Sequence, residues 1–197
     1  MTSINVDCSD GTYKWPTNLE NAKIKVSKTK FVYNGKNQLP EVTVTDPEGK
    51  VLVKDKDYYF DINGKKNGPS KNVDEYDVFI YGKGYFVGSN VFCFRILPKA
   101  TKITNLTSSK GNITVKWSKR TEQVKGYQIQ IATNSKFTKG KKTAKIAKNT
   151  TIKKVFKKLK AGKTYYVRVR TYKYGSYFEG NLYSAWSGVR KVTVKKN

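Results

Sequence analysis

Short runs in which apolar and polar residues alternate recur along this chain, separated by turns rich in Gly and Asn. In residues 127–131 and 165–170, for example, apolar residues alternate with glutamine, tyrosine or arginine. A period of two places successive side chains on opposite faces of an extended chain, so each run predicts a half-buried β-strand. Asn-Gly pairs such as Asn34-Gly35 favour tight turns between such strands.

The number of these runs predicts the fold class. Residues 101–196 contain seven strand-like runs, which is the number expected of an immunoglobulin-like sandwich. The best candidate helix, residues 153–160, is short and interrupted by β-branched residues, so we expect no helix there. The sequence therefore predicts an all-β fold of two tandem β-sandwich, immunoglobulin-like domains.

A step in charge density marks the expected domain boundary. Residues 1–98 contain 14 Lys and Arg against 12 Asp and Glu, a net charge of +2. Residues 99–197 contain the remaining 26 basic residues against two acids, Glu122 and Glu179, a net charge of +24. We therefore expect an N-terminal tail at 1–20, a first domain at 21–98 and a second domain at 99–197.

The second domain resembles a fibronectin type III domain. The segments that carry the resemblance are Trp117, Gly126-Tyr127, and residues 159–165, 165–170 and 183–187. The resemblance implies that Trp117 lies in the core. It also implies that the hydroxyl of Tyr165 reaches back to a backbone group across a corner between two strands. These features are specific for a fold and not for a function.

The first domain is similar to a bacterial Ig-like repeat found in surface proteins of Gram-positive gut anaerobes. Residues 31–36, 56–60 and 81–88 carry this similarity. The resemblance implies an extracellular or cell-surface location, tandem repetition, and a role in adhesion or spacing. Any signal peptide or wall anchor would then lie outside this sequence.

Cysteine and histidine usage excludes several kinds of site. The chain has no histidine and no Cys-x-x-Cys spacing, which argues against a zinc site and against histidine-dependent nucleophilic catalysis. Cys8 and Cys93 are either two unrelated thiols or a disulfide that ties the tail to the first domain, and spacing alone does not decide between them. No stretch approaches 18 apolar residues, so we expect no membrane span.

The acidic residues suggest no catalytic or metal site. Asp55, Asp57 and Asp61 lie close together, but the aromatic residues between them indicate a strand and not a calcium loop. Asp74, Glu75 and Asp77 supply carboxylates without any sign of the cleft that glycoside hydrolysis needs. We therefore expect no catalytic residue, no cofactor and no metal.

Basic residues of the second domain are the candidate binding site. A net charge of +24 attracts polyanions, such as anionic cell-wall polymers or glycans. The alternative is that lysine only solvates the surface and discourages strand pairing at sheet edges. Lysine outnumbers arginine heavily, which argues against specific nucleic-acid recognition. The candidate residues are Lys139, Lys141, Lys142, Lys153, Lys154, Lys157, Lys158, Lys160, Arg168 and Arg170.

Aromatic residues near the end of the chain form a second candidate surface. Tyr174, Tyr177 and Phe178 lie in a predicted loop, beside Tyr172 and Tyr183. Exposed aromatic side chains in a loop can stack on sugars or meet a protein partner. The alternative is that they cover one end of the sandwich.

These features together predict a non-catalytic structural or adhesive spacer of a bacterial cell-surface or secreted protein, monomeric as an isolated fragment. Its basic second domain would be attracted to anionic wall polymers or glycans. Two alternatives stay open: an ancillary module of a carbohydrate-active enzyme, and a basic nucleic-acid-binding module.

Overall fold

The structure of the protein, a computed structural model, describes residues 15–176 and 180–195. Strands make up nearly all of its regular structure, and the described residues form no α-helix. The chain divides into two compact units, Met1–Ile96 and Leu97–Asn197, here called unit 1 and unit 2. The predicted fold class, all-β with two tandem β-sandwich domains, is confirmed.

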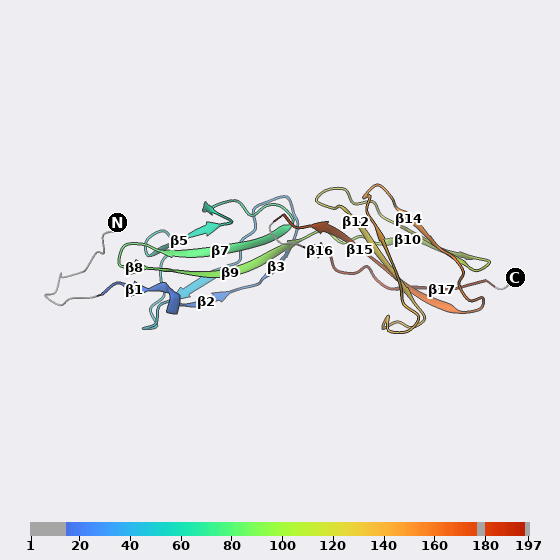
Figure 1. Cartoon of the computed structure of the whole chain (residues 1–197), viewed down its shortest axis with the longest axis horizontal. Coiled ribbons are helices and arrows are strands. Elements are labelled where there is room, and N and C mark those ends of the chain that lie inside the picture. Colours follow the sequence, from blue (N-terminus) through green and yellow to red (C-terminus); the bar gives the residue numbers. More distant parts are fainter. Residues whose placement is uncertain (1–14, 177–179, 196–197) are drawn as a thin grey trace. The chain divides into compact units, whose positions relative to one another are not determined.

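Unit 1 is built around a five-stranded sheet with the order β3-β9-β7-β5-β6. Its longest strands, β7 and β9, pair antiparallel and lie side by side (Figure 1). Two smaller sheets pair β2 with β4 and β1 with β8. The elements are β1 (Thr17–Asn18), the 3-10 turn η1 (Leu19–Asn21), β2 (Lys23–Val26), β3 (Lys30–Val32), β4 (Val42–Thr45), β5 (Tyr58–Ile62), β6 (Lys65–Lys66), β7 (Asp74–Gly82), β8 (Phe86–Val87) and β9 (Ser89–Leu97).

Alternation along β7 produces the core of unit 1. Tyr76, Val78 and Ile80 are buried, whereas the residues between them face outward. The ring of Tyr76 stacks on that of Phe94, with 5.2 Å between the ring centroids. Its hydroxyl donates to the carbonyl of Asn72 at 2.9 Å, so the polar tip of this buried ring is satisfied.

The end of the segment predicted as a tail packs within unit 1. The β1 strand pairs parallel with β8, and Leu19 in η1 is fully buried. The side-chain amide of Asn90 donates to the carbonyls of Leu19 and Ala22, at 3.1 and 3.2 Å. Trp15 is 77% exposed, so the backbone of this segment, and not the Trp15 ring, holds it to the unit.

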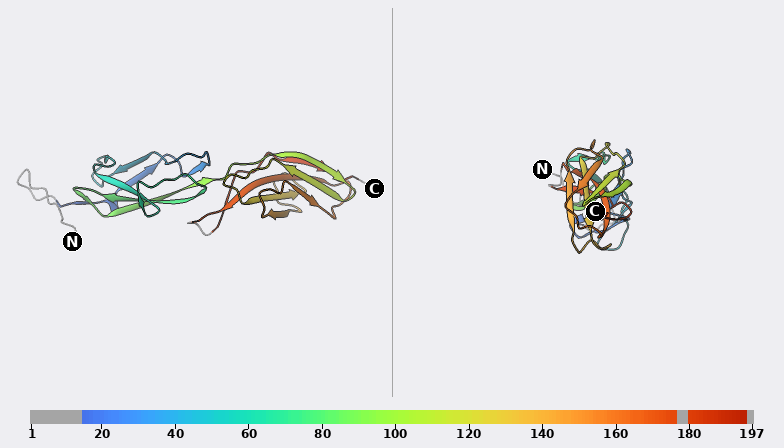
Figure 2. Two further views of the ribbon diagram at one scale, coloured as in Figure 1. Left: turned by 90° about the horizontal axis from the view of Figure 1, so that it is seen from above. Right: turned by 90° about the vertical axis from the view of Figure 1, so that its right-hand side faces the viewer.

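Unit 2 consists of two sheets (Figure 2). One has the order β10-β11-β14. The other has the order β13-β12-β15-β16, and β17 also pairs with β15. The strands are β10 (Ile103–Ser109), β11 (Asn112–Trp117), β12 (Gly126–Ala132), β13 (Lys142–Ile146), β14 (Lys153–Phe156), β15 (Thr164–Tyr174), β16 (Asn181–Tyr183) and β17 (Arg190–Thr193).

Trp117 and Tyr127 lie at the centre of the unit 2 core. Their ring centroids are 5.2 Å apart, and both side chains are essentially inaccessible to solvent. The Tyr127 hydroxyl accepts a hydrogen bond from the Arg120 amide at 2.7 Å and lies 2.9 Å from the Asn149 carbonyl. The core position predicted for Trp117 is therefore confirmed.

The connection from β14 to β15 forms the predicted tyrosine corner. Leu159 and Tyr165 are both buried. The Tyr165 hydroxyl accepts a hydrogen bond from the amide of Lys160, five residues upstream, at 3.4 Å. This contact fixes the direction in which the chain enters β15, the strand that carries Arg168 and Arg170.

Gly126 opens β12 where another backbone segment passes very close. A Cβ atom at this position would lie 1.9 Å from the carbonyl oxygen of Ile146, at the end of the neighbouring strand β13. No side chain fits at that separation, so only glycine permits the pairing of β12 with β13 at this end.

Candidate functional site

Two arginines on β15 project from the outer face of the four-stranded sheet of unit 2. The strand register places Arg168 opposite Gln130 and Arg170 opposite Gln128. The Gln130 side-chain oxygen accepts from Nε and Nη2 of Arg168, at 2.9 and 2.7 Å. The Gln128 oxygen accepts from Nε of Arg170 at 2.8 Å. Each guanidinium plane is therefore held in one orientation by a glutamine on the neighbouring strand.

Aromatic rings alternate with these guanidinium groups in one continuous stack. The Cζ atom of Arg168 lies 4.0 Å from the ring centroid of Phe137 and 4.2 Å from that of Trp186. The Cζ atom of Arg170 lies 4.3 Å from the centroid of Trp186 and 3.7 Å from that of Tyr183. These distances are within the range of cation–π attraction.

The stack continues at the Tyr183 end. The rings of Tyr183 and Tyr172 are 6.0 Å apart, and Nζ of Lys145 lies 4.6 Å from the Tyr172 centroid. We call the whole set the stacked ladder. Its members, in order, are Lys145, Tyr172, Tyr183, Arg170, Trp186, Arg168 and Phe137.

Two buried serines hold Trp186 over the sheet. The Ser184 hydroxyl accepts from the amide of Thr171, and the Ser187 hydroxyl accepts from the amide of Val169, both at 3.1 Å. The amides of the same serines donate to the carbonyls of Thr171 and Val169. The segment between β16 and β17 thus stays attached to β15 although it is not a strand, and the intervening Trp186 reaches the arginines.

A tight loop between β12 and β13 supplies Phe137. Phe137 has a positive φ of 57° and is only 4% exposed. The Asn134 side-chain oxygen accepts from the amides of Thr138 and Lys139, both at 3.0 Å, which closes the loop. The loop therefore places a buried ring under Arg168 and keeps Lys139 close to the end of the ladder.

The electrostatic environment of the ladder is strongly positive. Burial lowers the pKa of the Arg168 guanidinium from its ordinary value. Burial, and then the positive charge of Arg168, lower that of Arg170, while Tyr183 opposes the shift. Both groups stay protonated at neutral pH because the ordinary pKa of arginine is about 12 or higher. The described residues that the register places on this face are neutral or basic.

The structure separates the predicted basic residues into two groups. Lys139 and Lys141 lie in the loop before β13 and Lys142 begins that strand, so these three share a sheet with Arg168 and Arg170. The other five belong to the opposite sheet or to the connection that follows it: Lys153, Lys154, Lys157, Lys158 and Lys160. The ten residues therefore do not form one cluster.

The predicted aromatic loop differs from what the structure shows. Tyr172 is buried within β15 and pairs opposite Tyr183 in β16, because the strands continue further than the sequence pattern indicated. Tyr174, at the end of β15, is 57% exposed and lines a shallow hollow with Val124, Lys125 and Lys173. Tyr177 and Phe178 lie outside the described residues.

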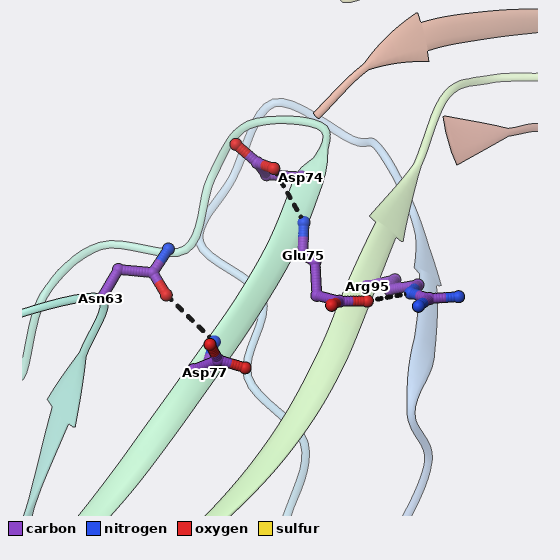
Figure 3. A network of polar contacts seen from close by, with 5 residues as sticks. All are labelled: Asn63, Asp74, Glu75, Asp77 and Arg95. Carbon is purple, nitrogen blue, oxygen red and sulfur yellow. Dashed lines mark hydrogen bonds and ion pairs between the residues drawn. The ribbon is translucent and has the colours of Figure 1, made fainter. Parts of the chain in front are cut away.

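Carboxylates of unit 1 serve local structural roles. Glu75 pairs with Arg95 across β7 and β9, and Asp74 accepts from the Glu75 amide at 3.0 Å (Figure 3). The Asp77 amide donates to the Asn63 side chain at 3.0 Å (Figure 3). Asp57 accepts from the amide of Val53 at 2.8 Å. No group of three or more potential metal ligands occurs among the described residues.

Cys93 lies exposed on β9, opposite Asp77. Cys8 falls within the first 14 residues, which lie outside the part that the structure describes. The Cys8–Cys93 disulfide therefore stays a prediction. Within the described ranges, no helix is long and apolar enough to cross a membrane.

Sequence reasoning located Arg168 and Arg170 but missed the residues that hold them. Gln128 and Gln130 were visible only as the polar half of an alternating strand, and Phe137 only as one apolar residue in a lysine-rich loop. The shared spacing of two residues, in 128/130 and in 168/170, was the available signal. It becomes informative only when β12 and β15 are known to be neighbours.

Comparison with known proteins gives a consistent result for unit 2. No match was found among curated protein sequences. Two solved structures are similar to this chain at 16% sequence identity and a TM-score of 0.37, and each covers 50% of it. One comes from work on computer-based redesign of a β-sandwich protein, with 92% of that chain covered. The other is described as a myokine structure, with 100% covered.

A family comparison identifies the domain that carries the stacked ladder. The model of the fibronectin type III domain matches residues 97–181. This range includes β12, β13 and β15, the strands that provide the two arginines, their glutamine partners and Lys145. Domains of this type are typically non-catalytic structural modules, and no catalytic family is identified. A fibronectin type III domain is therefore present in this chain at residues 97–181.

Proposed function

We propose that this chain is a non-catalytic structural or adhesive spacer of a bacterial cell-surface or secreted protein. Its basic second unit would draw it to anionic cell-wall polymers or glycans, and its first unit would be the bacterial Ig-like repeat suggested by the sequence. The detected fibronectin type III domain supports the modular, non-catalytic part of this proposal.

The observation that carries the proposal is the unequal distribution of charge. Residues 99–197 contain 26 basic residues and two carboxylates. At most a few of these cations can pair within the unit, so most remain available to a partner. A surface of this kind produces a field of several kT, which raises the local concentration of polyanions.

Salt-dependent binding tests the proposal. The full chain is measured against immobilised poly(glycerol phosphate), an acidic polysaccharide, a neutral glycan and duplex DNA over about 50–500 mM salt. We expect binding to the two wall-like and acidic polymers that weakens steeply with salt, and no retention on the neutral glycan. Absence of binding to every polyanion at physiological salt would contradict the proposal.

The same experiment separates the alternatives. Sequence-selective retention on duplex DNA would favour a nucleic-acid-binding module. Salt-insensitive binding to a neutral glycan would favour an ancillary module of a carbohydrate-active enzyme. Lysine contributes 22 of the 26 basic residues of 99–197. Lysine is a compact point charge and lacks the bidentate fork by which arginine recognises bases and phosphates.

A further inference from the structure

We infer that the stacked ladder is a binding site for a linear, base-free polyol-phosphate chain, whose successive phosphates are received by Arg168 and Arg170. This inference rests on the proposed function and assigns the attraction to one face of unit 2. Four observations support it: fixed guanidinium groups, unused N–H donors, the spacing between the two arginines, and the absence of free ring faces.

The guanidinium groups are already ordered before any ligand binds. Gln130 and Gln128 fix their planes through hydrogen bonds of 2.7–2.9 Å, and aromatic rings contact them within 4.3 Å. Arginine recognises phosphate through two parallel N–H donors. A fixed fork loses little conformational entropy on binding, whereas a flexible lysine must be immobilised.

Part of each fork remains unused. Arg168 donates through Nε and Nη2, and Arg170 through Nε. Among the described residues, Nη1 of Arg168 and both η nitrogens of Arg170 have no hydrogen-bond acceptor. These groups lie on the outer face of the sheet, because β12 directs Ile129 and Ile131 into the core and its glutamines outward. An external phosphate can therefore accept from them without disturbing the stack.

The spacing of the arginines suits a phosphodiester with a three-carbon linker. Positions two apart on a strand are separated by about 6.6 Å. Trp186 lies between the two guanidinium groups, with Cζ-to-centroid distances of 4.2 and 4.3 Å. Six backbone bonds join successive phosphorus atoms in a glycerol phosphate polymer. Since three such bonds advance an extended chain by about 3.5 Å, six advance it by about 7 Å.

Additional cations lie at both ends of the ladder. Lys145 contacts Tyr172 at one end. Towards the other end, the register places Lys191 opposite Tyr166, which is two residues before Arg168 on the same face of β15. Lys139 follows Phe137 in the loop under Arg168. A chain lying along the ladder would therefore meet positive charge over more than two repeats.

The stack itself argues against single-stranded nucleic acid, which has the same six-bond repeat. Proteins that bind single strands expose aromatic faces on which bases stack. Here Trp186 and Tyr183 already contact guanidinium groups, and Phe137 and Tyr172 are each 4% exposed. The face offers positive charge without a stacking platform, which suits a polymer that has phosphates and no bases.

The test compares two sets of lysine substitutions that remove the same charge from opposite sheets. The ladder variant is Lys139→Gln, Lys145→Gln and Lys191→Gln. The matched control is Lys116→Gln, Lys153→Gln and Lys157→Gln; Lys116 pairs with Lys153 in the other sheet, and all six lysines are exposed. The full chain is titrated with synthetic poly(glycerol phosphate) and with oligothymidine of equal phosphate number, over a range of salt concentrations.

Counterion release gives the expected size of the effect. Each phosphate contact on a flexible strand contributes about 0.7 to the slope of log K against log salt. The ladder variant should therefore reduce the slope for poly(glycerol phosphate) by about 2 and weaken binding at least tenfold near physiological salt. The control variant should change the slope by less than about 1, and oligothymidine should bind the wild type more weakly than poly(glycerol phosphate).

A second variant tests the forks directly. Replacing both arginines, Arg168→Lys and Arg170→Lys, keeps the net charge and removes bidentate recognition, so binding should fall about tenfold or more. Far-UV circular dichroism establishes whether this variant is folded. If it is not, the comparison of the two lysine variants decides.

The outcomes distinguish this inference from the proposed function. Equal losses in the ladder and control variants would overturn the site and leave a diffuse polyanion attraction, so the proposed function would stand. Equal or tighter binding of oligothymidine would overturn the assignment to a base-free polymer. Failure of the wild type to bind any polyanion would contradict both.

Discussion

Trp186 is the residue whose removal tests the stacked ladder most directly. Its ring contacts two guanidinium groups at 4.2 and 4.3 Å, and each such contact is worth about 0.5–2 kcal/mol, depending on desolvation. Because both arginines are partly buried, we take about 1–1.5 kcal/mol for each. Lost packing of the half-buried ring adds about 1 kcal/mol. Trp186→Ala should therefore lower the free energy of unfolding of unit 2 by about 3–4 kcal/mol.

Hydrogen exchange measured by mass spectrometry on the full chain is the appropriate assay. Peptides from β12 and β15 report on unit 2, while peptides from β7 and β9 provide an internal control in unit 1. The fluorescence of the whole chain is less selective, since it contains three tryptophans. Trp186→Phe, which keeps a ring face for the guanidinium groups, should recover about half of the lost stability.

A double-mutant cycle distinguishes the ladder from independent surface contacts. Arg170→Ala and Trp186→Ala remove the same interaction, so their effects should be less than additive by about 1 kcal/mol or more. Additive effects, or a loss below about 1 kcal/mol for Trp186→Ala, would refute the assignment of the ladder as a stabilising network.

Three further predictions concern the core of unit 2. Tyr127→Phe leaves the amide of Arg120 without its acceptor and should cost about 1–3 kcal/mol in urea unfolding, whereas Tyr166→Phe, at a half-buried position, should cost less than about 0.5 kcal/mol; similar losses would contradict this. Gly126→Ala places a Cβ 1.9 Å from a backbone oxygen and should cost at least about 2 kcal/mol, while Gly188→Ala, with nothing within 4 Å, should be nearly neutral in the same melt. Burial raises the pKa of Tyr127 above its ordinary value of 10.0, so the unfolded chain loses this proton first; stability should be complete below about pH 10 and fall as pH rises through the folded-state pKa, and a smaller alkaline drop in Tyr127→Phe checks this.

The predictable part of the fold is the part fixed by local alternation. The periods of two in residues 127–131 and 165–170 assign Ile129 and Val169 to the core and Gln128 and Arg170 to the outer face, and the structure agrees. The tyrosine corner was also predictable, because Leu159 and Tyr165 lie within one short segment. In each case the residues that determine the feature are close together in the sequence.

The ladder was not predictable because its members come from five separate segments. Trp186 lies 16 residues beyond Arg170, and Phe137 lies 31 residues before Arg168. The lysine clusters show the opposite error. Lys142 and Lys153 are close in the sequence, yet β13 and β14 belong to different sheets because the chain crosses the sandwich between them. Proximity in the sequence therefore suggested one basic cluster where the topology makes two.

The division between arginine and lysine in unit 2 follows from these two placements. Arg168 and Arg170 contribute to folding through their stacked faces and Nε atoms, and their η nitrogens remain available to a ligand. The lysines on β14 and after it make no comparable stack, so they act on a polyanion mainly through the long-range field, which falls off within about 8 Å at physiological salt. Raising the salt concentration should therefore remove the lysine contribution first and leave the hydrogen-bonding contribution of the two arginines. A polyanion held only by charge would lose both at the same rate.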